Sequence, residues 1–583
     1  MSKNTLKNYN PMAILDPFRG TDYDGSWPTI PEMFNITVKR CPDRNCFTEF
    51  DDKGNRSTLT YRQAHENILK LAYWLSAHGI HHGEKIAVTG KNSPEWATVF
   101  LAALYAGATI CPIDYALKCE EQENLLATAQ PKFLFVDDEK YDWYASKKNG
   151  FSIYSLNKKR PETYVYDLAV SEQERKAIQL DLPKEEDTAA ILFTSGTTSI
   201  PKGVMLSHKN LISDAFIAQT NMIIDCHDVF YALLPIHHAY TMQAVFMESI
   251  CIGAEIVFGK SLSVSKMMTD LKQGNITMML GVPMLFNKLA DGIEKAIKKK
   301  GAAVCAIISI LRQVSYLTKK LFGINIGKKL FKSVLTQANL YTIRIAISGG
   351  GPLSKSVFRF FNEMGIDFVQ GYGLTETSPI IALNPVEHFK IESVGSYFAG
   401  HMQMKILNPN EDGIGEICVK GPMVMQGYYN LPEETAKVFT EDGWFKTGDL
   451  GWLDNENYLM LSGRAKNMIV TEGGKNVYPE EIEDMFQLES DIQQITVQGY
   501  IANAERHSEE LEALVYPSDS AYECRNLKRA DKDAQEPIKA VITDIVDKIN
   551  RKLLPYQRIT KTTILDAPLE MTTTLKVKRH YTK

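Results

Sequence analysis

The chain has 583 residues, of which 44% are hydrophobic and 23% charged, and its formal net charge is −5. These values are typical of a globular protein and exclude a disordered, collagen-like or low-complexity chain. A mildly acidic chain is also a poor candidate for general nucleic-acid binding, so we expect no nucleic-acid partner. The nine cysteines are scattered singly without a C-x-x-C pair, which argues against a disulfide framework or a zinc ribbon and favours a reducing cytosol.

Short β-branched runs alternate with amphipathic stretches through most of the chain. The runs that we predict as strands are Lys85–Thr89, Ala108–Ile113, Phe133–Val136, Ala189–Phe193, Val229–Leu234, Ala254–Phe258, Ile276–Leu280 and Arg344–Ile347. The stretches that we predict as helices are Tyr61–His78, Pro94–Tyr105 and Val264–Gln273. This alternation predicts an α/β fold with doubly wound, largely parallel sheets, in which helices cover both faces of apolar strands.

The pattern changes near Leu407, where glycines and turn residues become dense and indicate a small antiparallel β unit. After Gly463 a mixed α+β pattern follows, with a helix predicted at Pro537–Lys552. We therefore predict a large N-terminal domain over residues 1–465 and a small, mobile C-terminal domain over residues 466–583.

Residues 287–339 form a basic, apolar insertion with eleven basic and two acidic side chains. Within it, apolar residues at helical spacing form one face of a predicted helix: Ile307, Ile310, Leu311, Val314, Leu317 and Leu321. Two interpretations stay open. A basic amphipathic helix can lie on an anionic membrane surface, and an ordinary helix can pack its apolar face on the core and leave a basic side in solvent.

We find no targeting segment, because the first forty residues lack an apolar run after a basic start. The longest strongly apolar stretch, Gly301–Leu311, is about half of the ~20 residues that a spanning helix needs. We expect a cytoplasmic protein, with peripheral contact on the inner face of the membrane left open. A homodimer also stays open, since the sequence does not fix the oligomeric state.

The most informative segment is the loop Leu192–Val204, which follows a predicted buried strand. Five hydroxyl residues crowd around Gly196, and Lys202 closes the loop. Hydroxyls and backbone N–H groups in a glycine-permitted turn can bind phosphate oxygens, and a lysine adds positive charge. The spacing does not match a Walker A loop. On its composition alone, a Ser/Thr/Gly-rich segment is more often an ordinary loop than a phosphate site.

Three further motifs carry groups suited to a nucleotide. Ser348–Leu353 (SGGGPL) has glycines that let a planar ring lie against the backbone. Gln370–Thr377 (QGYGLTET) combines an aromatic ring for stacking, a hydroxyl for a phosphate and a carboxylate for Mg²⁺. Trp444–Asp449 (WFKTGD) places a carboxylate at a turn, where it suits ribose hydroxyls.

Together with GRAKNMIV at 463–470 and GGKNVYPEEIE at 473–483, these motifs closely resemble, in order, the superfamily of AMP-forming adenylating enzymes. That superfamily includes acyl-CoA synthetases, luciferases and peptide-synthetase adenylation domains, and the resemblance runs from about Thr60 to the C-terminus. Within it, the chain is most similar to long-chain fatty acyl-CoA synthetases. The similarity rests on the insertion before SGGGPL, on Ile549–Ile559 and on the ending Thr574–Arg579.

The resemblance implies that ATP activates a fatty acid to an acyl-adenylate with release of pyrophosphate, and that coenzyme A then displaces AMP. The residues implied to bind the β- and γ-phosphates are Thr194, Ser195, Gly196, Thr197, Thr198 and Lys202. Those implied to border adenine are Gly350, Gly351 and Tyr372. Thr375 would contact the α-phosphate, Glu376 would hold Mg²⁺, and Asp449 and Arg464 would bind the ribose.

The resemblance also implies a division of labour in the C-terminal domain. Lys576 would stabilise charge on the α-phosphate and carboxylate during adenylation. Lys466 would be the hinge about which the domain swings, and Gly474 would then line the tunnel for the pantetheine arm of coenzyme A. His238 matches a position near the acyl carboxylate, although a buried histidine with a purely structural role is an equal alternative.

Three details qualify these assignments. Ser199 stands where many relatives have glycine, and its small side chain should leave phosphate binding intact. Leu575 replaces the common glycine before the catalytic lysine, so Lys578 is a competitor for Lys576, which the spacing from Pro568 favours. The pair His237–His238 does not predict a metal site, because adjacent residues rarely present both rings to one ion and the sequence shows no third ligand.

Two other functions are compatible with the same motifs. An acyl-AMP ligase would share the first half-reaction and deliver the acyl group to a carrier protein. A catalytically dead nucleotide-binding or membrane-recruitment protein would keep the fold alone, and the intact Lys202, Glu376, Asp449 and Lys576 argue against it.

Overall fold

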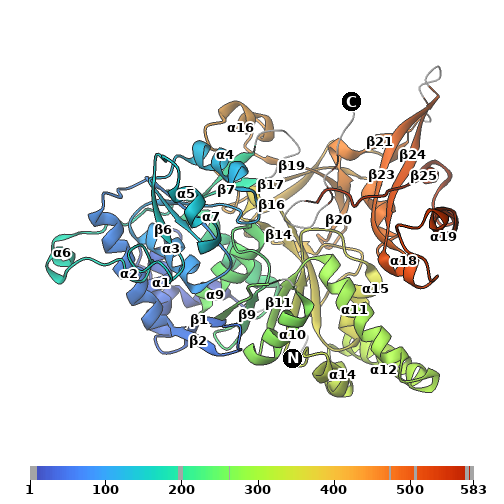
Figure 1. The fold of residues 1–583 in the computed structure, drawn as a ribbon, viewed down its shortest axis with the longest axis horizontal. Coiled ribbons are helices and arrows are strands. Elements are labelled where there is room, and N and C mark those ends of the chain that lie inside the picture. The colour runs from blue at the N-terminus through green and yellow to red at the C-terminus, as the bar shows by residue number, and fades with distance from the viewer. Residues whose placement is uncertain are drawn as a thin grey trace.

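The computed structural model describes residues 9–194, 201–261, 263–471, 475–503 and 508–571, together with Val577 and Arg579. A large N-terminal part contains two mixed sheets with helices around them, and a smaller β/α part follows at the C-terminal end (Figure 1). The predicted fold class is therefore confirmed.

The first large sheet has seven strands, and its core is parallel. In spatial order the strands are β18 (Gly427–Tyr428), β8 (Lys202–Ser207), β7 (Thr188–Thr194), β4 (Thr109–Pro112), β3 (Lys85–Thr89), β5 (Phe133–Val136) and β6 (Ser152–Ser155). The five strands from β7 to β6 pair in parallel, whereas β8 and β18 extend the sheet antiparallel. The turn between β7 and β8 is the predicted phosphate loop.

The second large sheet has nine strands and is parallel in its middle. In spatial order they are β15 (Ser396–Tyr397), β14 (Ile380–Leu383), β13 (Asp367–Gly373), β12 (Ile345–Ser348), β11 (Met278–Gly281), β9 (Val229–Ala232), β10 (Glu255–Phe258), β1 (Asn45–Phe50) and β2 (Arg56–Thr60). Antiparallel pairs at both ends, β13–β14–β15 and β1–β2, complete it. All eight predicted strands exist, and their ends differ from the prediction by at most two residues.

The three helices predicted for this part are also confirmed, as α2 (Tyr61–Ala77), α3 (Pro94–Tyr105) and α10 (Val264–Gly274). Helix α3 is buried almost throughout, which explains its apolar composition. It begins where the Ser93 side chain accepts a hydrogen bond from the Trp96 N–H and where Pro94 occupies the first turn.

Further helices surround the two sheets. They are α1 (Ile30–Arg40), α4 (Cys119–Ala129), α5 (Asp138–Ala145), α6 (Glu172–Ala177), α7 (His208–Ala218), α8 (Ala239–Thr241), the π-helix η5 (Met242–Met247), α9 (Glu248–Ile252), α15 (Lys355–Glu363) and α16 (Pro432–Val438). One large core cluster joins residues of both sheets with α1, α2, α3 and α7, so these elements pack as one body.

The predicted small β unit is an antiparallel sheet of four strands. It consists of β16 (Gln403–Leu407), β17 (Gly415–Lys420), β19 (Phe445–Leu453) and β20 (Leu459–Arg464). It begins slightly before the predicted change at Leu407.

The C-terminal part has its own core, formed by buried residues between Ile469 and Ile559. Its elements are β21 (Ile469–Val470), β22 (Asn476–Val477), α17 (Pro479–Asp484), β23 (Ile492–Asn503), β24 (Ser508–Pro517), α18 (Asp519–Glu523), α19 (Gln535–Asn550) and β25 (Ile559–Ile564). Helix α19 confirms the helix predicted at Pro537–Lys552. Lys466 lies in the single turn η7 (Ala465–Asn467), and the domain boundary there stays a prediction.

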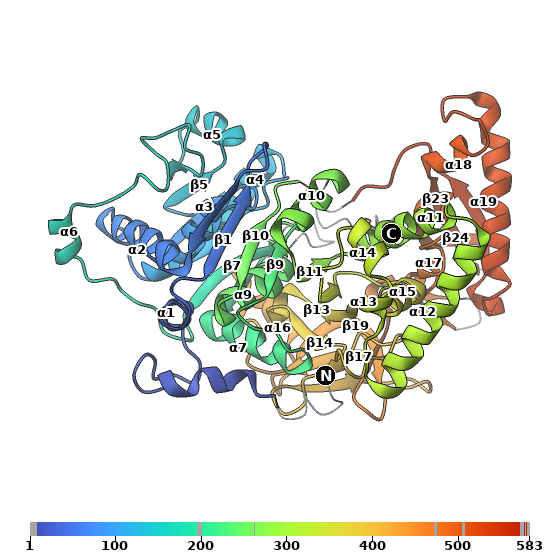
Figure 2. The ribbon, with the colours of Figure 1, turned by 90° about the horizontal axis from the view of Figure 1, so that it is seen from below.

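The basic insertion lies in α11 (Pro283–Lys298), α12 (Ala302–Phe322), α13 (Gly327–Leu330) and α14 (Lys332–Gln337). These helices lie along the lower right edge of Figure 1 and on the side that faces the viewer in Figure 2. Helix α12 is about twice as long as the expected apolar stretch Gly301–Leu311. Among the described residues, it is the one helix long and apolar enough to cross a membrane by length and composition. The apolar stretch is therefore longer than expected, but core helices of globular proteins meet the same criterion, and one side of α12 packs on the second core cluster.

Candidate active site

Strands from two sheets meet at a cluster of Tyr372, Asp449 and Arg464. Asp449 on β19 and Arg464 on β20 are directly opposite each other in the antiparallel pair, and Arg464 Nε lies 2.9 Å from Asp449 Oδ1. The hydroxyl of Tyr372, near the end of β13, donates a hydrogen bond of 2.7 Å to Asp449 Oδ2. Burial and the adjacent Asp449 raise the pKa of Tyr372 well above its usual value, so the phenol stays protonated as the donor. The structure thus brings together three residues predicted from separate motifs.

The glycine motif that follows β12 lies beneath an aromatic ring of the protein itself. A Cβ atom at Gly349 would lie 2.9 Å from the ring of Tyr240, whose hydroxyl donates to the Ile347 carbonyl at 3.1 Å. Gly350 has φ +79°, a conformation that favours glycine, while a Cβ at Gly351 would meet only ordinary contacts. Close approach of a ring therefore explains Gly349, and backbone conformation explains Gly350.

Glu376 lies in the short 3-10 turn η6 (Thr375–Thr377) directly after β13. The hydroxyl of Tyr428, a residue of β18, donates to Glu376 Oε1 at 2.9 Å. Tyr428 is 6% exposed, and its burial raises the pKa of the phenol above the usual range. The predicted magnesium ligand is thus held by a tyrosine that no motif had indicated, while Thr375 lies beside it, half-buried.

The two ends of the phosphate loop are paired across β7 and β8. Thr194 and Lys202 face each other in the antiparallel register, and the Thr194 hydroxyl donates to the Lys202 carbonyl at 3.4 Å. Lys202 Nζ lies 2.7 Å from Glu434 Oε2 on α16 and 4.8 Å from the centre of the Tyr428 ring. The hydrogen bond from Lys202 is the main reason why the pKa of Glu434 is lowered to about 2. Ser195, Gly196, Thr197, Thr198 and Ser199 lie outside the described residues.

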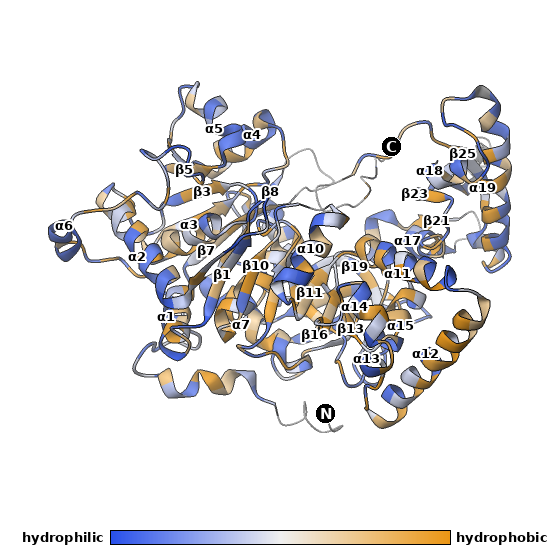
Figure 3. Cartoon of the chain, turned by 60° about the horizontal axis from the view of Figure 1, so that its bottom comes forward, coloured by the Kyte–Doolittle hydropathy of each residue, from blue (hydrophilic) through white to orange (hydrophobic). Residues whose placement is uncertain are grey.

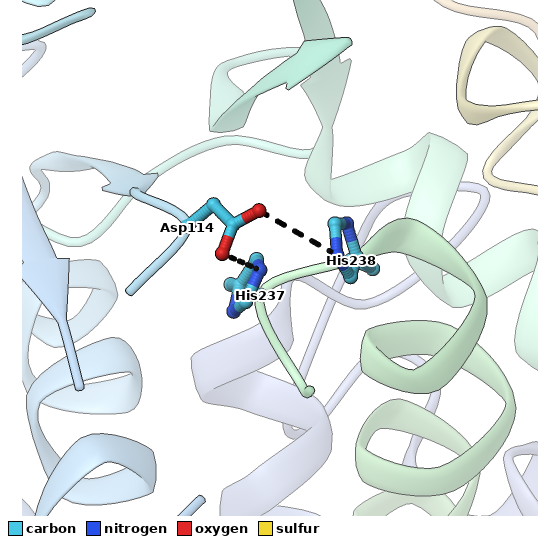
Figure 4. A group of neighbouring side chains, drawn as sticks. All are labelled: Asp114, His237 and His238. Carbon is cyan, nitrogen blue, oxygen red and sulfur yellow. Dashed lines mark ion pairs between the residues drawn. The ribbon is translucent and has the colours of Figure 1, made fainter. Parts of the chain in front are cut away.

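His237 and His238 approach the same carboxylate, that of Asp114 (Figure 4). His237 Nε2 lies 3.1 Å from Asp114 Oδ1, in an ion-pair contact outside hydrogen-bond geometry, and His238 Nε2 lies 3.9 Å from Oδ2. His237 is buried, whereas His238 directly precedes α8 and is partly exposed. The argument that no third ligand accompanies the histidines is wrong, because the ligand atoms of all three residues lie within 4.8 Å of one another.

The C-terminal part contacts this region through α17 and the segment after it. Gln487 Nε2 donates to the Pro352 carbonyl at 2.9 Å, which links that part to the SGGGPL motif. Glu480 of α17 accepts a hydrogen bond from Asn467, next to the predicted hinge Lys466. Gly474, Lys576 and Lys578 lie outside the described residues, so their roles stay predictions.

Four side chains of this region carried no sequence signal: Asp114, Tyr240, Tyr428 and Glu434. Each lies far along the chain from the group that it contacts, and none belongs to a motif quoted above. Only the folded arrangement shows which tyrosine and which carboxylate hold the predicted ligands.

Known proteins match this chain over most of its length. A family model described as AMP-binding enzyme matches residues 34–429. The probable acyl-activating enzyme 16, chloroplastic, of Arabidopsis thaliana is 27% identical over 95% of this chain and 87% of its own. A long-chain-fatty-acid–acyl-carrier-protein ligase, chloroplastic, of the same plant is 28% identical over 81% and 75%. The long-chain-fatty-acid–CoA ligase heimdall of Drosophila melanogaster is 28% identical over 79% and 73%.

The fold is shared with solved structures. The ATP-bound MatB from Rhodopseudomonas palustris has a TM-score of 0.73 at 24% identity, with 94% of this chain and 97% of that chain covered. Because the family model matches more than half of the chain, the protein belongs to the AMP-binding enzyme family. Its resemblance to AMP-forming adenylating enzymes is thereby confirmed, and the protein is a member of an adenylate-forming ligase family.

Proposed function

We propose that the protein is an ATP-dependent fatty acyl-CoA ligase that works in the cytoplasm. In the first half-reaction a carboxylate oxygen of the acid attacks the α-phosphorus of ATP, and the bond to pyrophosphate breaks. In the second, the thiolate of coenzyme A attacks the acyl carbon, and AMP leaves. The observation that carries the proposal is the cluster of Tyr372, Asp449 and Arg464, because three separate motifs converge there on one carboxylate.

The geometry of that cluster suits ribose hydroxyls. An ionised carboxylate offers about four lone-pair positions, and Tyr372 and Arg464 occupy two of those on Asp449. Two acceptor positions then stay available for the two hydroxyls of a ribose. The ion pair with Arg464 also keeps the carboxylate in place before the nucleotide arrives, which lowers the cost of ordering the site.

Glu376 suits the magnesium role for a related reason. Tyr428 holds one carboxylate oxygen, Oε1, which leaves Oε2 to face a cation. Proteins hold Mg²⁺ through one or two carboxylates together with substrate phosphates, and the ion when bound neutralises charge on those phosphates. Lys202 would add a compact ammonium on the phosphate side, with Glu434 keeping it extended until the phosphates compete for it.

The remaining roles are proposed from the family resemblance. Lys576 would stabilise the charge that develops between the carboxylate and the α-phosphate, and a swing about Lys466 would exchange it for the Gly474 loop. Glycine at that position would let the thin pantetheine arm pass close to the backbone. His238 would border the acyl carboxylate, with Asp114 holding the imidazole in position.

A second acceptor is favoured by one specific observation. The plant relative named as an acyl-carrier-protein ligase is as similar to this chain as the relative named as a CoA ligase, at 28% identity each. An acyl-AMP ligase that delivers its product to a carrier protein is therefore the alternative. The two functions share every residue discussed for the first half-reaction and differ only in the thiol.

The test is a pyrophosphate-release screen over acids from acetate to oleate, with and without coenzyme A and with a phosphopantetheinylated carrier protein as a third arm. We expect turnover with a long-chain acid only when coenzyme A is present, and a single pyrophosphate per enzyme without an acceptor. Turnover with the carrier protein but not with coenzyme A would establish the alternative. Absence of labelled pyrophosphate exchange into ATP with every acid would overturn both and favour a catalytically dead protein.

A further inference from the structure

Helix α12 turns its most apolar face away from the protein. Ile310 and Leu317, near the middle of the helix, are 64% and 51% exposed. The large apolar side chains exposed on the helix, here called the α12 face, are Ile307, Ile310, Val314, Leu317, Leu321 and Phe322. Figure 3 shows α12 as a largely hydrophobic helix at the margin of the molecule. Large apolar side chains gathered in this way on a solvent-facing surface usually mark an interaction site.

The opposite side of α12 is fixed to the domain by ion pairs. Arg312 Nε lies 2.7 Å from Glu363 Oε2 on α15, and Lys319 Nζ lies 2.7 Å from Asp367 Oδ1 at the start of β13. Lys319 is buried and also donates to Asn362 Oδ1 at 2.7 Å. The two basic residues therefore point inward and the apolar row points outward. Of the six residues predicted for the apolar face, only Leu311 packs against the core, and the other five are exposed. The interpretation in which that face packs on the core is therefore wrong for five of its six residues.

Exposed lysines lie at both ends of the α12 face. Lys298, Lys299 and Lys300 precede the helix, and Lys320, Lys329 and Lys332 lie in its last turn or in the two short helices that follow. Lys319 does not belong to this set, because it is buried against Asp367. The surface thus combines an apolar centre with positive charge on both sides.

We propose that the α12 face and these six lysines dock the protein on an anionic lipid bilayer. The apolar side chains would enter the boundary between headgroups and acyl chains, and the lysines would contact the anionic headgroups. Charge complementarity favours this occupant over a second copy of the chain. Two copies packed through this face would bring lysines against lysines in either helix orientation, which repels.

The helix lies along the membrane surface and does not cross it. The ion pairs of Arg312 and Lys319 hold one side of α12 against α15 and β13, so that side cannot face lipid. An amphipathic helix that exposes one apolar face lies in the interface plane, with that face buried about 5–10 Å. Docking through α12 is independent of the proposed function, because it requires neither ATP nor an acid.

The test is flotation of the full-length protein with vesicles of phosphatidylcholine alone and with about one third phosphatidylserine. We expect binding to the anionic vesicles that falls at high salt, and little binding to the neutral ones. Ile310→Ser with Leu317→Ser should reduce the bound fraction at least tenfold. The triple variant Lys298→Gln, Lys299→Gln and Lys300→Gln should also reduce it, since each lysine near the surface contributes about fivefold in affinity.

A matched control replaces exposed apolar residues elsewhere, Leu182→Ser with Leu488→Ser, and should bind vesicles as the native protein does. Retained pyrophosphate release in solution shows that the α12 variants are folded, and their unfolding midpoint provides the same check if no activity is found. Equal flotation of the Ile310/Leu317 variant and the native protein would overturn the proposal. So would failure of the native protein to bind anionic vesicles, or a concentration-dependent dimer in sedimentation that the same substitutions abolish.

Discussion

Tyr428 provides the sharpest test of the magnesium assignment, because its hydroxyl holds Glu376 and no other predicted ligand. The change Tyr428→Phe removes that hydroxyl and keeps the aromatic ring that lies 4.8 Å from Lys202 Nζ. A hydrogen bond to a charged group contributes about 1.5–3 kcal/mol. Residues that orient a metal ligand typically change metal affinity by about 10- to 100-fold when they are replaced.

We therefore expect Tyr428→Phe to raise the Mg²⁺ concentration for half-maximal pyrophosphate release by about 10- to 100-fold. The rate at saturating Mg²⁺ should stay near that of the native enzyme, since the carboxylate itself is still present. The effect should be the same between pH 6 and pH 9, because burial raises the pKa of Tyr428 above that range and the hydroxyl remains protonated. The assay is a Mg²⁺ titration of pyrophosphate release at fixed ATP and acid.

Tyr429→Phe is the matched control, because this neighbouring ring lies over Lys85 instead of Lys202. It should leave the Mg²⁺ requirement unchanged. An unchanged requirement in Tyr428→Phe would show that Glu376 does not hold the ion. A lower requirement would show that the hydroxyl competes with Mg²⁺ for Glu376 and does not position it.

Three further predictions concern the hinge, the histidines and the C-terminal part. Lys466→Pro should spare pyrophosphate release but block thioester formation from isolated acyl-adenylate, and equal loss in both assays would contradict the hinge role. Asp114→Asn should lower kcat/KM for the acid about tenfold while KM for ATP stays constant, because the lost contact affects only the histidine side of the site. An equal change in the kinetic constants of both substrates would contradict the role proposed for Asp114. Burial and Glu483 raise the pKa of Asp484 to about 7, so its ionisation destabilises the folded state increasingly as pH rises from about 4 to 7. Asp484→Asn should therefore raise the thermal unfolding midpoint more at pH 8 than at pH 4.5. The free energy of unfolding should rise by about 1–4 kcal/mol at pH 8. A rise of the midpoint that does not depend on pH would refute the assignment.

The strands of the two large sheets could be predicted because both of their faces are buried. Runs such as Phe133–Val136 are then apolar throughout, and their limits follow from composition alone. Strand β13 shows no such pattern at its end, because Gly371 and Tyr372 are only partly buried and Gly373 is exposed. A Cβ at Gly373 would lie 1.6 Å from the Pro379 carbonyl oxygen, so the returning backbone requires glycine there. Close approach of the backbone, and not burial of an apolar side chain, decides the residue at that point.

Helix α12 shows a different limit of periodicity. The spacing of Ile307, Ile310 and Leu317 correctly identifies one apolar face, but periodicity does not say toward which side a helix turns that face. Glu363 and Asp367 decide the direction, because they bind the basic residues of the opposite side. Asp114 was missed for a comparable reason. It follows β4 of the seven-stranded sheet, whereas His237 and His238 follow β9 of the nine-stranded sheet, so only the packing of the fold brings them together.

The two ion pairs of the candidate site must behave differently when the nucleotide arrives. Ribose hydroxyls are neutral and need only acceptor positions, so Asp449 can keep Arg464 while it binds them. The phosphates are anionic and need the ammonium of Lys202, which Glu434 already holds. With its pKa lowered to about 2, Glu434 stays ionised at neutral pH and competes with the phosphates for Lys202. In the proposed nucleotide site, Asp449 would therefore be a permanent part, whereas Glu434 would hold Lys202 only until ATP brings stronger acceptors.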